Sequence, residues 1–209
     1  FVLMLVVHDA YFYWSHRLFH HPKVFRRFHL THHKSVTPTP FASYSFDIPA
    51  AVVHAAFFPL WFGIVSTPVA VVQVFVIFAL TRNVLGHTGV EILPRFTVDN
   101  VVLDQFTTTT HHDLHHTGHF RHNFGLYFTW WDRLMGTEHP RYKEVFREVT
   151  SRDGGDARVT ARPGGRRAVA VRGGRGSAGQ RVILVYKIAL KNSSSPSRGD
   201  TKFRTHSAM

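Results

Sequence analysis

Histidines in this chain recur at the spacing of an α-helical turn, and this pattern constrains the fold more than any other feature of the sequence. His16 and His20 are four residues apart, and the segment HLTHH places His29, His32 and His33 at positions i, i+3 and i+4. Because side chains three and four residues apart share one face of a helix, each group directs its imidazoles toward one point. Helices present several ligands to one metal ion in this way.

A third group supplies the partner that the first two need. His112, His115 and His116 repeat the i, i+3, i+4 spacing, and His87 is a possible ninth member of the set. Eight or nine imidazoles exceed what one tetrahedral zinc ion uses, and they suit two ions of near-octahedral geometry. The chain has no cysteine, so any metal must be held by nitrogen or oxygen. The sequence therefore predicts a two-metal centre with imidazole ligands.

The net charge of +12 is distributed unevenly along the chain. Residues 1–150 contain 12 Lys and Arg against 10 Asp and Glu, whereas residues 151–209 contain 13 against 3. The near-neutral first part gives no support for nucleic-acid binding. The second part is rich in Gly, Arg and Ser and cannot bury enough apolar surface to order itself. We therefore divide the chain into a body, 1–150, and a basic tail, 151–209, which we expect to be disordered or unrelated sequence.

A long apolar segment separates the histidine groups of the body. From Ile48 to Leu85 only Arg82 carries a formal charge, and the stretch GIVSTP divides the segment into two pieces. Each piece is at or below the ~20 residues that an upright membrane helix needs, which allows two tilted helices, a re-entrant hairpin or a buried soluble hairpin. A hairpin returns the chain to the side where it started, as a site shared by histidines on both flanks requires.

These features predict an all-α fold, an integral-membrane helical bundle with a His-rich helical cap. Lys and Arg collect in the segments that flank the hairpin, which places the cap on the cytoplasmic side. The chain opens on FVLMLVV without an initiator Met, so we expect it to be N-terminally truncated within an apolar helix. A metal site facing hydrocarbon indicates a lipid substrate. Because oxidation of an unactivated C–H bond needs a redox metal and O2, iron is favoured over zinc.

Several blocks of sequence lie around the histidine groups: HDAYFYWSHRLFHH, HLTHHKS with TPTPFASY, GHTGVE, and THHDLHH with NFGLYFTWWDRLMGTEHPRY. Together they cover essentially residues 1–150, and they resemble the fatty acid hydroxylase/sterol desaturase superfamily of membrane oxygenases. The resemblance implies a non-haem di-iron centre and O2-dependent hydroxylation or desaturation of a sterol or fatty-acyl lipid. It also implies electrons from a cytochrome b5 or ferredoxin-type reductase chain, in the bacterial inner membrane or the endoplasmic reticulum.

The same resemblance assigns roles to individual residues. The implied metal ligands are His16, His20, His29, His32, His33, His87, His112, His115 and His116. Asp9 and Asp113 would orient ligand imidazoles through hydrogen bonds, and Asn123 or Glu91 would position a water or a histidine. Five further histidines lie outside the matched spacings, and we expect each to support the site or lie at the surface: His8, His21, His111, His119 and His122. Asp132, in WWDRLMGT, is expected to fold the C-terminal part of the body over the site.

Two other classes of function compete with this interpretation. A His-rich membrane protein that binds or transports a metal without oxidising anything would place ionisable residues within its spans, and the hairpin offers His54 and Arg82. A zinc hydrolase would carry a general-base Glu within a motif such as HExxH, and the sequence has none.

Overall fold

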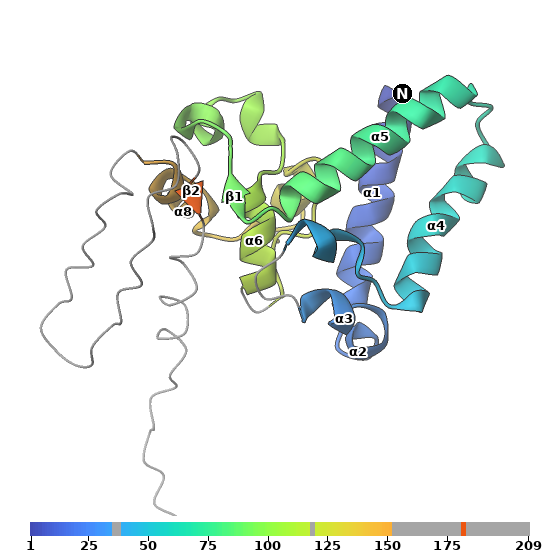
Figure 1. The fold of residues 1–209 in the computed structure, drawn as a ribbon, viewed down its shortest axis with the longest axis horizontal. Coiled ribbons are helices and arrows are strands. Elements are labelled where there is room, and N and C mark those ends of the chain that lie inside the picture. Colours follow the sequence, from blue (N-terminus) through green and yellow to red (C-terminus); the bar gives the residue numbers. More distant parts are fainter. Residues whose placement is uncertain (35–38, 118–119, 152–180, 183–209) are drawn as a thin grey trace, which may run out of the picture.

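A computed structural model describes residues 1–34, 39–117, 120–151 and 181–182 (Figure 1). The helices are α1 (Val2–Phe19), α2 (Phe25–Phe28), α3 (Leu30–His33), α4 (Ile48–Phe62), α5 (Val69–Gly86), α6 (Thr109–Thr117), α7 (Trp130–Leu134) and α8 (Tyr142–Thr150). Short 3₁₀ helices are η1 (Pro40–Tyr44), η2 (Arg95–Asp99) and η3 (Leu103–Gln105). The described chain is therefore helix-rich, as the sequence predicts.

One small feature departs from an all-α fold. The two-residue strands β1 (Val90–Glu91) and β2 (Arg181–Val182) pair antiparallel, with Val90 opposite Val182. Apart from Ser151 and β2, the segment 151–209 lies outside the described residues, so its expected disorder stays a prediction.

The apolar segment forms a helical hairpin, α4 followed by α5 (Figure 1). Pro49 occupies the first turn of α4, where its missing N–H costs nothing, and Pro68 precedes α5. Within the described residues α5 alone has the length and composition of a membrane span, with a mean hydropathy of 1.9 over 18 residues, and only 6% of it is buried. Ile77, for example, is 65% exposed. Such exposure of apolar side chains argues against the buried soluble hairpin.

The second histidine group does not lie on one continuous helix. α2 ends at Phe28 and α3 begins at Leu30, and His29 between them has a φ of −139°. Hydrogen bonds still cross the break, because the His29 N–H donates to the Phe25 carbonyl and the His33 N–H to the His29 carbonyl. The expected helical spacing therefore survives, although the helix is interrupted at its first histidine.

Two apolar cores hold these elements around the histidines. α1 packs against α4, and α6 packs against both α5 and α8. The core beside the hairpin contains Met4, Leu5, Phe57, Trp61, Phe75, Tyr127 and Phe128. The core behind α6 contains Val98, Leu114, Tyr142, Val145 and Phe146. The histidine-rich interior lies where α1, α3, the end of α5 and α6 meet.

Candidate metal centre

The structure brings the nine histidines assigned as ligands into two groups. The five-histidine cluster is His16, His20, His29, His33 and His115. The four-histidine cluster is His32, His87, His112 and His116. In each cluster one ring nitrogen from every member lies within 4.8 Å of those of the others. Seven of the nine side chains are buried, and His20 and His112 are partly exposed.

The HxxHH spacing explains how two short segments serve both clusters. Residues four apart differ by about 40° around a helix, whereas adjacent residues differ by about 100°. His29 and His33 accordingly stay together in the five-histidine cluster, while His32 points into the other. On α6 the opposite division occurs. His112 and His116, four residues apart, join the four-histidine cluster, and His115 joins the five-histidine cluster. Each segment therefore gives two ligands to one cluster and one to the other.

Distances between ring nitrogens match the edges of a coordination shell. Nε2 of His33 lies 3.1 Å from Nε2 of His20 and 3.1 Å from that of His115. In the other cluster, Nε2 of His112 lies 3.0 Å from Nε2 of His87. Two imidazole nitrogens bound about 2.1 Å from one ion at right angles are roughly 3.0 Å apart. The ring nitrogens are therefore spaced as ligands of a shared ion would be.

Hydrogen bonds between the rings cannot satisfy all of these nitrogens. Nδ1 of His115 donates to the His122 carbonyl, so Nε2 of the neutral ring has only a lone pair. Nε2 of His33 carries either one hydrogen or one lone pair, yet it faces two neighbouring nitrogens. Nε2 of His16 and both ring nitrogens of His29 are buried without a hydrogen-bond partner. Buried polar atoms are normally paired, and a cation in each cluster would supply the missing partner.

Burial keeps these imidazoles in the form that binds metals. Desolvation lowers the pKa of His115 to about 3. It also lowers the pKa of His29, His32 and His116 well below the usual value, and neighbouring imidazoles lower each further. Each ring is therefore neutral at pH 7, with a lone pair free for coordination.

Main-chain carbonyls fix the orientation of three rings. Nδ1 of His16 donates to the Phe124 carbonyl at 2.9 Å, and Nδ1 of His115 donates to the His122 carbonyl at 2.7 Å. Nδ1 of His87 donates to the Asn83 carbonyl at 2.7 Å. Each bond places the hydrogen on Nδ1 and leaves Nε2 for the cluster. Sequence reasoning missed these partners, because any residue has a carbonyl and only the fold decides which one a ring meets.

Two of the expected support residues, Asp9 and Asn123, bind mainly to main-chain groups. Oδ1 of Asp9 accepts from the Tyr127 N–H, and its Oδ2 accepts from the Trp130 indole. The side chain of Asn123 donates to the His111 carbonyl and accepts from the His139 N–H. Both residues thus hold the segment 123–139 in place. None of these hydrogen bonds reaches a clustered imidazole, and the expected supporting roles of Asp9 and Asn123 stay predictions.

The other two support residues lie on or against α6. Oε2 of Glu91 accepts from both the N–H and the hydroxyl of Thr110, at 2.9 and 2.7 Å, in the first turn of the helix. A carboxylate there satisfies a free N–H and complements the positive end of the helix. Asp113 is buried on α6, and its expected role as an imidazole partner stays a prediction.

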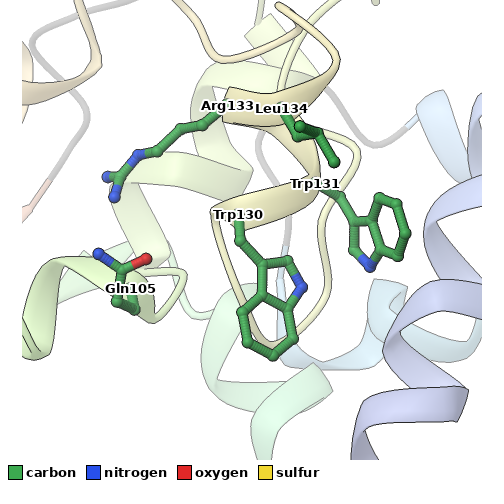
Figure 2. Close-up of a pocket in the computed structure, with 5 residues that line it drawn as sticks. All are labelled: Gln105, Trp130, Trp131, Arg133 and Leu134. Atoms are coloured by element: carbon green, nitrogen blue, oxygen red, sulfur yellow. The ribbon is translucent and has the colours of Figure 1, made fainter.

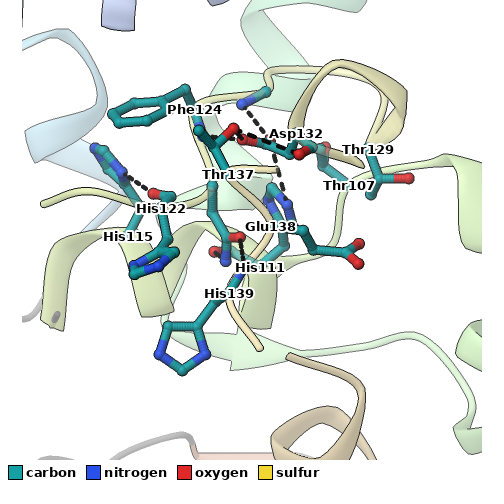
Figure 3. Close-up of polar contacts among 12 residues, drawn as sticks. Thr107, His111, His115, His122, Phe124, Thr129, Asp132, Thr137, Glu138 and His139 are labelled. Carbon is teal, nitrogen blue, oxygen red and sulfur yellow. Dashed lines mark hydrogen bonds and ion pairs between the residues drawn. The ribbon is translucent and has the colours of Figure 1, made fainter. Parts of the chain in front are cut away.

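A second polar assembly adjoins His115 of the five-histidine cluster (Figure 3). Asp132 is fully buried and lies 3.5 Å from Nε2 of His111, which is also fully buried. Burial raises the pKa of Asp132 to about 6 and lowers that of His111 to about 3, so at pH 7 a carboxylate faces a neutral imidazole. His111 therefore supports the interior rather than lying at the surface, and it belongs to neither cluster.

One surface hollow is separate from the clusters. It has a volume of about 620 Å³ and is lined by Gln105, Trp130, Trp131, Arg133 and Leu134 (Figure 2). Arg133 on its wall is paired with the carboxylates of Asp104 and Glu138. No clustered histidine lines this hollow, so we assign it no part in metal chemistry.

An exposed apolar hairpin beside two buried histidine clusters defines a helical protein with a paired imidazole centre. The chain belongs to the fatty acid hydroxylase family, whose model matches residues 1–137. This finding confirms the resemblance to the fatty acid hydroxylase/sterol desaturase superfamily.

Relatives within this family carry the names of sterol-oxidising enzymes. The chain is 34% identical to a Delta(7)-sterol 5(6)-desaturase of Leptosphaeria maculans, over 66% of this chain and 36% of that protein. It is 33% identical to methylsterol monooxygenase 1 of Gallus gallus, over 64% of this chain and 44% of the relative. A Delta(7)-sterol 5(6)-desaturase of Aspergillus fumigatus is 31% identical over 73% of this chain and 41% of its own length. The chain thus spans about two-fifths of the length of these relatives. No solved structure matches it.

Proposed function

We propose that this chain carries the metal centre of a lipid oxidoreductase that uses O2 to hydroxylate or desaturate a sterol or fatty-acyl lipid. The observation that carries the proposal is the pair of buried clusters, in which nine neutral imidazoles converge and several ring nitrogens have no hydrogen-bond partner. The names of the relatives support a lipid substrate of sterol type.

Two iron ions, one in each cluster, would supply the redox chemistry that activates O2 toward a C–H bond. The chain's own residues hold the ligand set. Burial keeps the imidazoles neutral and excludes bulk water. The carbonyls of Asn83, His122 and Phe124 fix three of the rings with Nε2 directed into the clusters. Imidazole ligands alone suit several transition metals, and the need to oxidise an unactivated C–H bond favours iron.

The hairpin side of the clusters is apolar, which fits a lipid that approaches from that side. The Phe12 ring lies 5.1 Å from the His16 ring in the five-histidine cluster. The Phe46 ring stacks 5.3 Å from the His32 ring in the four-histidine cluster. His54 of α4 lies against both phenyl rings, at 5.1 and 5.2 Å. Aromatic rings thus lie between each cluster and His54 of α4, and we infer that the substrate chain enters along this wall from the membrane.

We further propose that α5 spans a membrane and that the clusters lie at its cytoplasmic face. The exposed side chains of Lys23, Arg26 and Arg27 adjoin the second histidine group, as the positive-inside rule expects. An electron-transfer protein of the cytochrome b5 or ferredoxin type would then reach the centre from that compartment.

Metal analysis of the detergent-purified full-length protein tests the proposal, combined with lipid turnover assayed under O2 with a reductase. We expect two irons per chain and an O2-dependent hydroxylated or desaturated product. Stoichiometric zinc with no turnover after iron reconstitution would refute an oxygenase and favour a protein that binds or transports metal without oxidising a substrate.

A further inference from the structure

We propose that Asp132 is a positioning residue for the five-histidine cluster and not for the four-histidine cluster. It acts through the loop 122–125, whose carbonyls hold two of the five imidazoles. The inference rests on the proposed metal centre, which it deepens by giving the two clusters different supports.

The first step is the contact between the carboxylate and the loop. Oδ1 of Asp132 accepts from the Phe124 N–H at 2.9 Å, and Oδ2 accepts from the Gly125 N–H at 2.8 Å. The Gly125 N–H belongs to the same peptide unit as the Phe124 carbonyl, which accepts from His16. The His122 carbonyl, two residues before Phe124 in the loop, accepts from His115 (Figure 3). One carboxylate therefore fixes a loop that orients His16 and His115, two ligands that are 99 residues apart in the sequence.

The second step is the support of the carboxylate itself. Asp132 lies in the first turn of α7 and is fully buried. The Thr137 hydroxyl is 2.8 Å from its Oδ1, and the Thr137 N–H donates to its main-chain carbonyl at 2.7 Å. The Thr137 hydroxyl also contacts the Tyr13 hydroxyl at 2.8 Å, which links this assembly to α1. The carboxylate is thus fixed by contacts outside the loop as well as by the loop itself.

The third step is the fit of the loop against Asp132. A Cβ placed on Gly125 would lie 2.4 Å from the Phe128 carbonyl oxygen and 2.9 Å from Oδ2 of Asp132, so only glycine allows this approach. Asn123 has a φ of +60°, a strained conformation that its two side-chain hydrogen bonds hold in place. These contacts hold the loop 122–125 in one conformation, packed around the Asp132 carboxylate.

The four-histidine cluster uses other supports. His87 donates to the Asn83 carbonyl, four residues earlier on α5. The ring of His32 stacks on the Phe46 ring, with 5.3 Å between the ring centroids. Neither contact passes through the loop 122–125. Loss of the Asp132 carboxylate should therefore disturb one cluster and spare the other.

Anaerobic titration of the full-length protein with Fe(II) tests this asymmetry. Asp132→Asn keeps the size of the side chain but presents an NH2 group to one of the two loop N–H groups. We expect the affinity of one Fe(II) site to fall by about 10- to 100-fold, the range for loss of a partner that orients a ligand. The second site should keep its wild-type affinity. Comparison with His115→Ala and His116→Ala, each of which removes a ligand from one cluster, identifies the weakened site.

Two further variants separate positioning from general loss of structure. Asp104→Asn removes a buried carboxylate that pairs with Arg133 and Lys143, outside the loop, and should keep both Fe(II) sites. Gly125→Ala displaces the loop without changing a charge, and it should weaken the same site as Asp132→Asn. Thermal unfolding of each metal-free variant shows whether it is folded.

The possible results are distinguishable. A wild-type protein that binds fewer than two Fe(II) would overturn the proposed centre itself. Two wild-type sites that both survive Asp132→Asn and Gly125→Ala with unchanged affinity would overturn the role of Asp132 alone. Equal weakening of both sites in Asp132→Asn and in Asp104→Asn would also overturn it, because a structural defect would then account for the loss.

Discussion

The two histidine clusters differ in what orients their rings. In the five-histidine cluster, His16 bonds to a carbonyl 108 residues away and His115 bonds to the neighbouring loop. In the four-histidine cluster, His87 bonds to a carbonyl four residues earlier in its own helix. The ligand types are the same, yet one cluster depends on distant parts of the chain and the other has a locally oriented member.

This difference indicates how the centre forms. The bond within α5 is available as soon as that helix exists, whereas the bonds of His16 and His115 need the loop 122–125 to dock against α1 and α7. We therefore expect the five-histidine cluster to be the more sensitive of the two to changes in tertiary packing.

Removal of a ligand should have the largest effect and should separate the clusters. His115→Ala and His32→Ala each delete one ligand, from the five- and the four-histidine cluster respectively, and we expect each to lower turnover by more than about 100-fold. Iron analysis measures the metal content of each variant, and an O2-dependent lipid assay measures its turnover. His139→Ala is the matched control, because this half-buried ring lies outside both clusters. Full iron content and activity in His115→Ala would show that the clusters are not the site.

Acid should act on both clusters through their buried imidazoles. In the folded protein the pKa of His115, in the five-histidine cluster, falls to about 3 and that of His87, in the four-histidine cluster, to about 4, below the value of about 6.5 in an unfolded chain. The unfolded state thus binds more protons below pH 6.5. The contribution of these neutral imidazoles to the free energy of unfolding is complete above pH 6.5 and is lost as the pH falls toward 3.

Each such group should lower the free energy of unfolding by up to about 1.4 kcal/mol per pH unit in this window. Denaturant unfolding of the metal-free protein in detergent at pH 7, 6 and 5 measures the slope. Equal stability at the three pH values would contradict the burial of these rings.

A change at the start of α6 should affect the clusters equally, because this helix supplies ligands to both. Glu91→Gln weakens the acceptor for the Thr110 N–H and hydroxyl, and we expect a loss of about 1–3 kcal/mol in stability. Fe(II) titration should show both sites weakened by a similar factor. Selective loss of one site would mean that α6 does not support the clusters jointly.

The smallest effect is expected at a glycine beside the four-histidine cluster. A Cβ on Gly86 would meet His112 at 4.0 Å, an ordinary contact, whereas a Cβ on Gly125 would clash. Gly86→Ala should therefore leave both Fe(II) sites intact and change stability by at most about 1 kcal/mol. Loss of a metal site in this variant, measured by the same titration, would show that the four-histidine cluster is as tightly packed as the loop.

Much of the architecture is predictable from the sequence. An apolar segment with Arg82 as its one formal charge, interrupted by GIVSTP, predicts the hairpin that α4 and α5 form. The HxxxH and HxxHH spacings select eight of the nine histidines that the structure groups, because helical geometry is local and readable from residue numbers. The sequence does not predict the break of the helix at His29, since no Pro or Gly marks it.

By itself, the sequence determines which side chains are able to meet and that they need an apolar hairpin between them. Only the tertiary structure decides how the nine histidines divide between the two clusters. His32 and His115 each belong to a different cluster from the other two histidines of their motif. It also decides that Asp9, Asn123 and Asp132 hold main-chain groups. The physical reason is that ring orientation depends on carbonyls, which every residue carries, so their positions follow from the packing of distant segments.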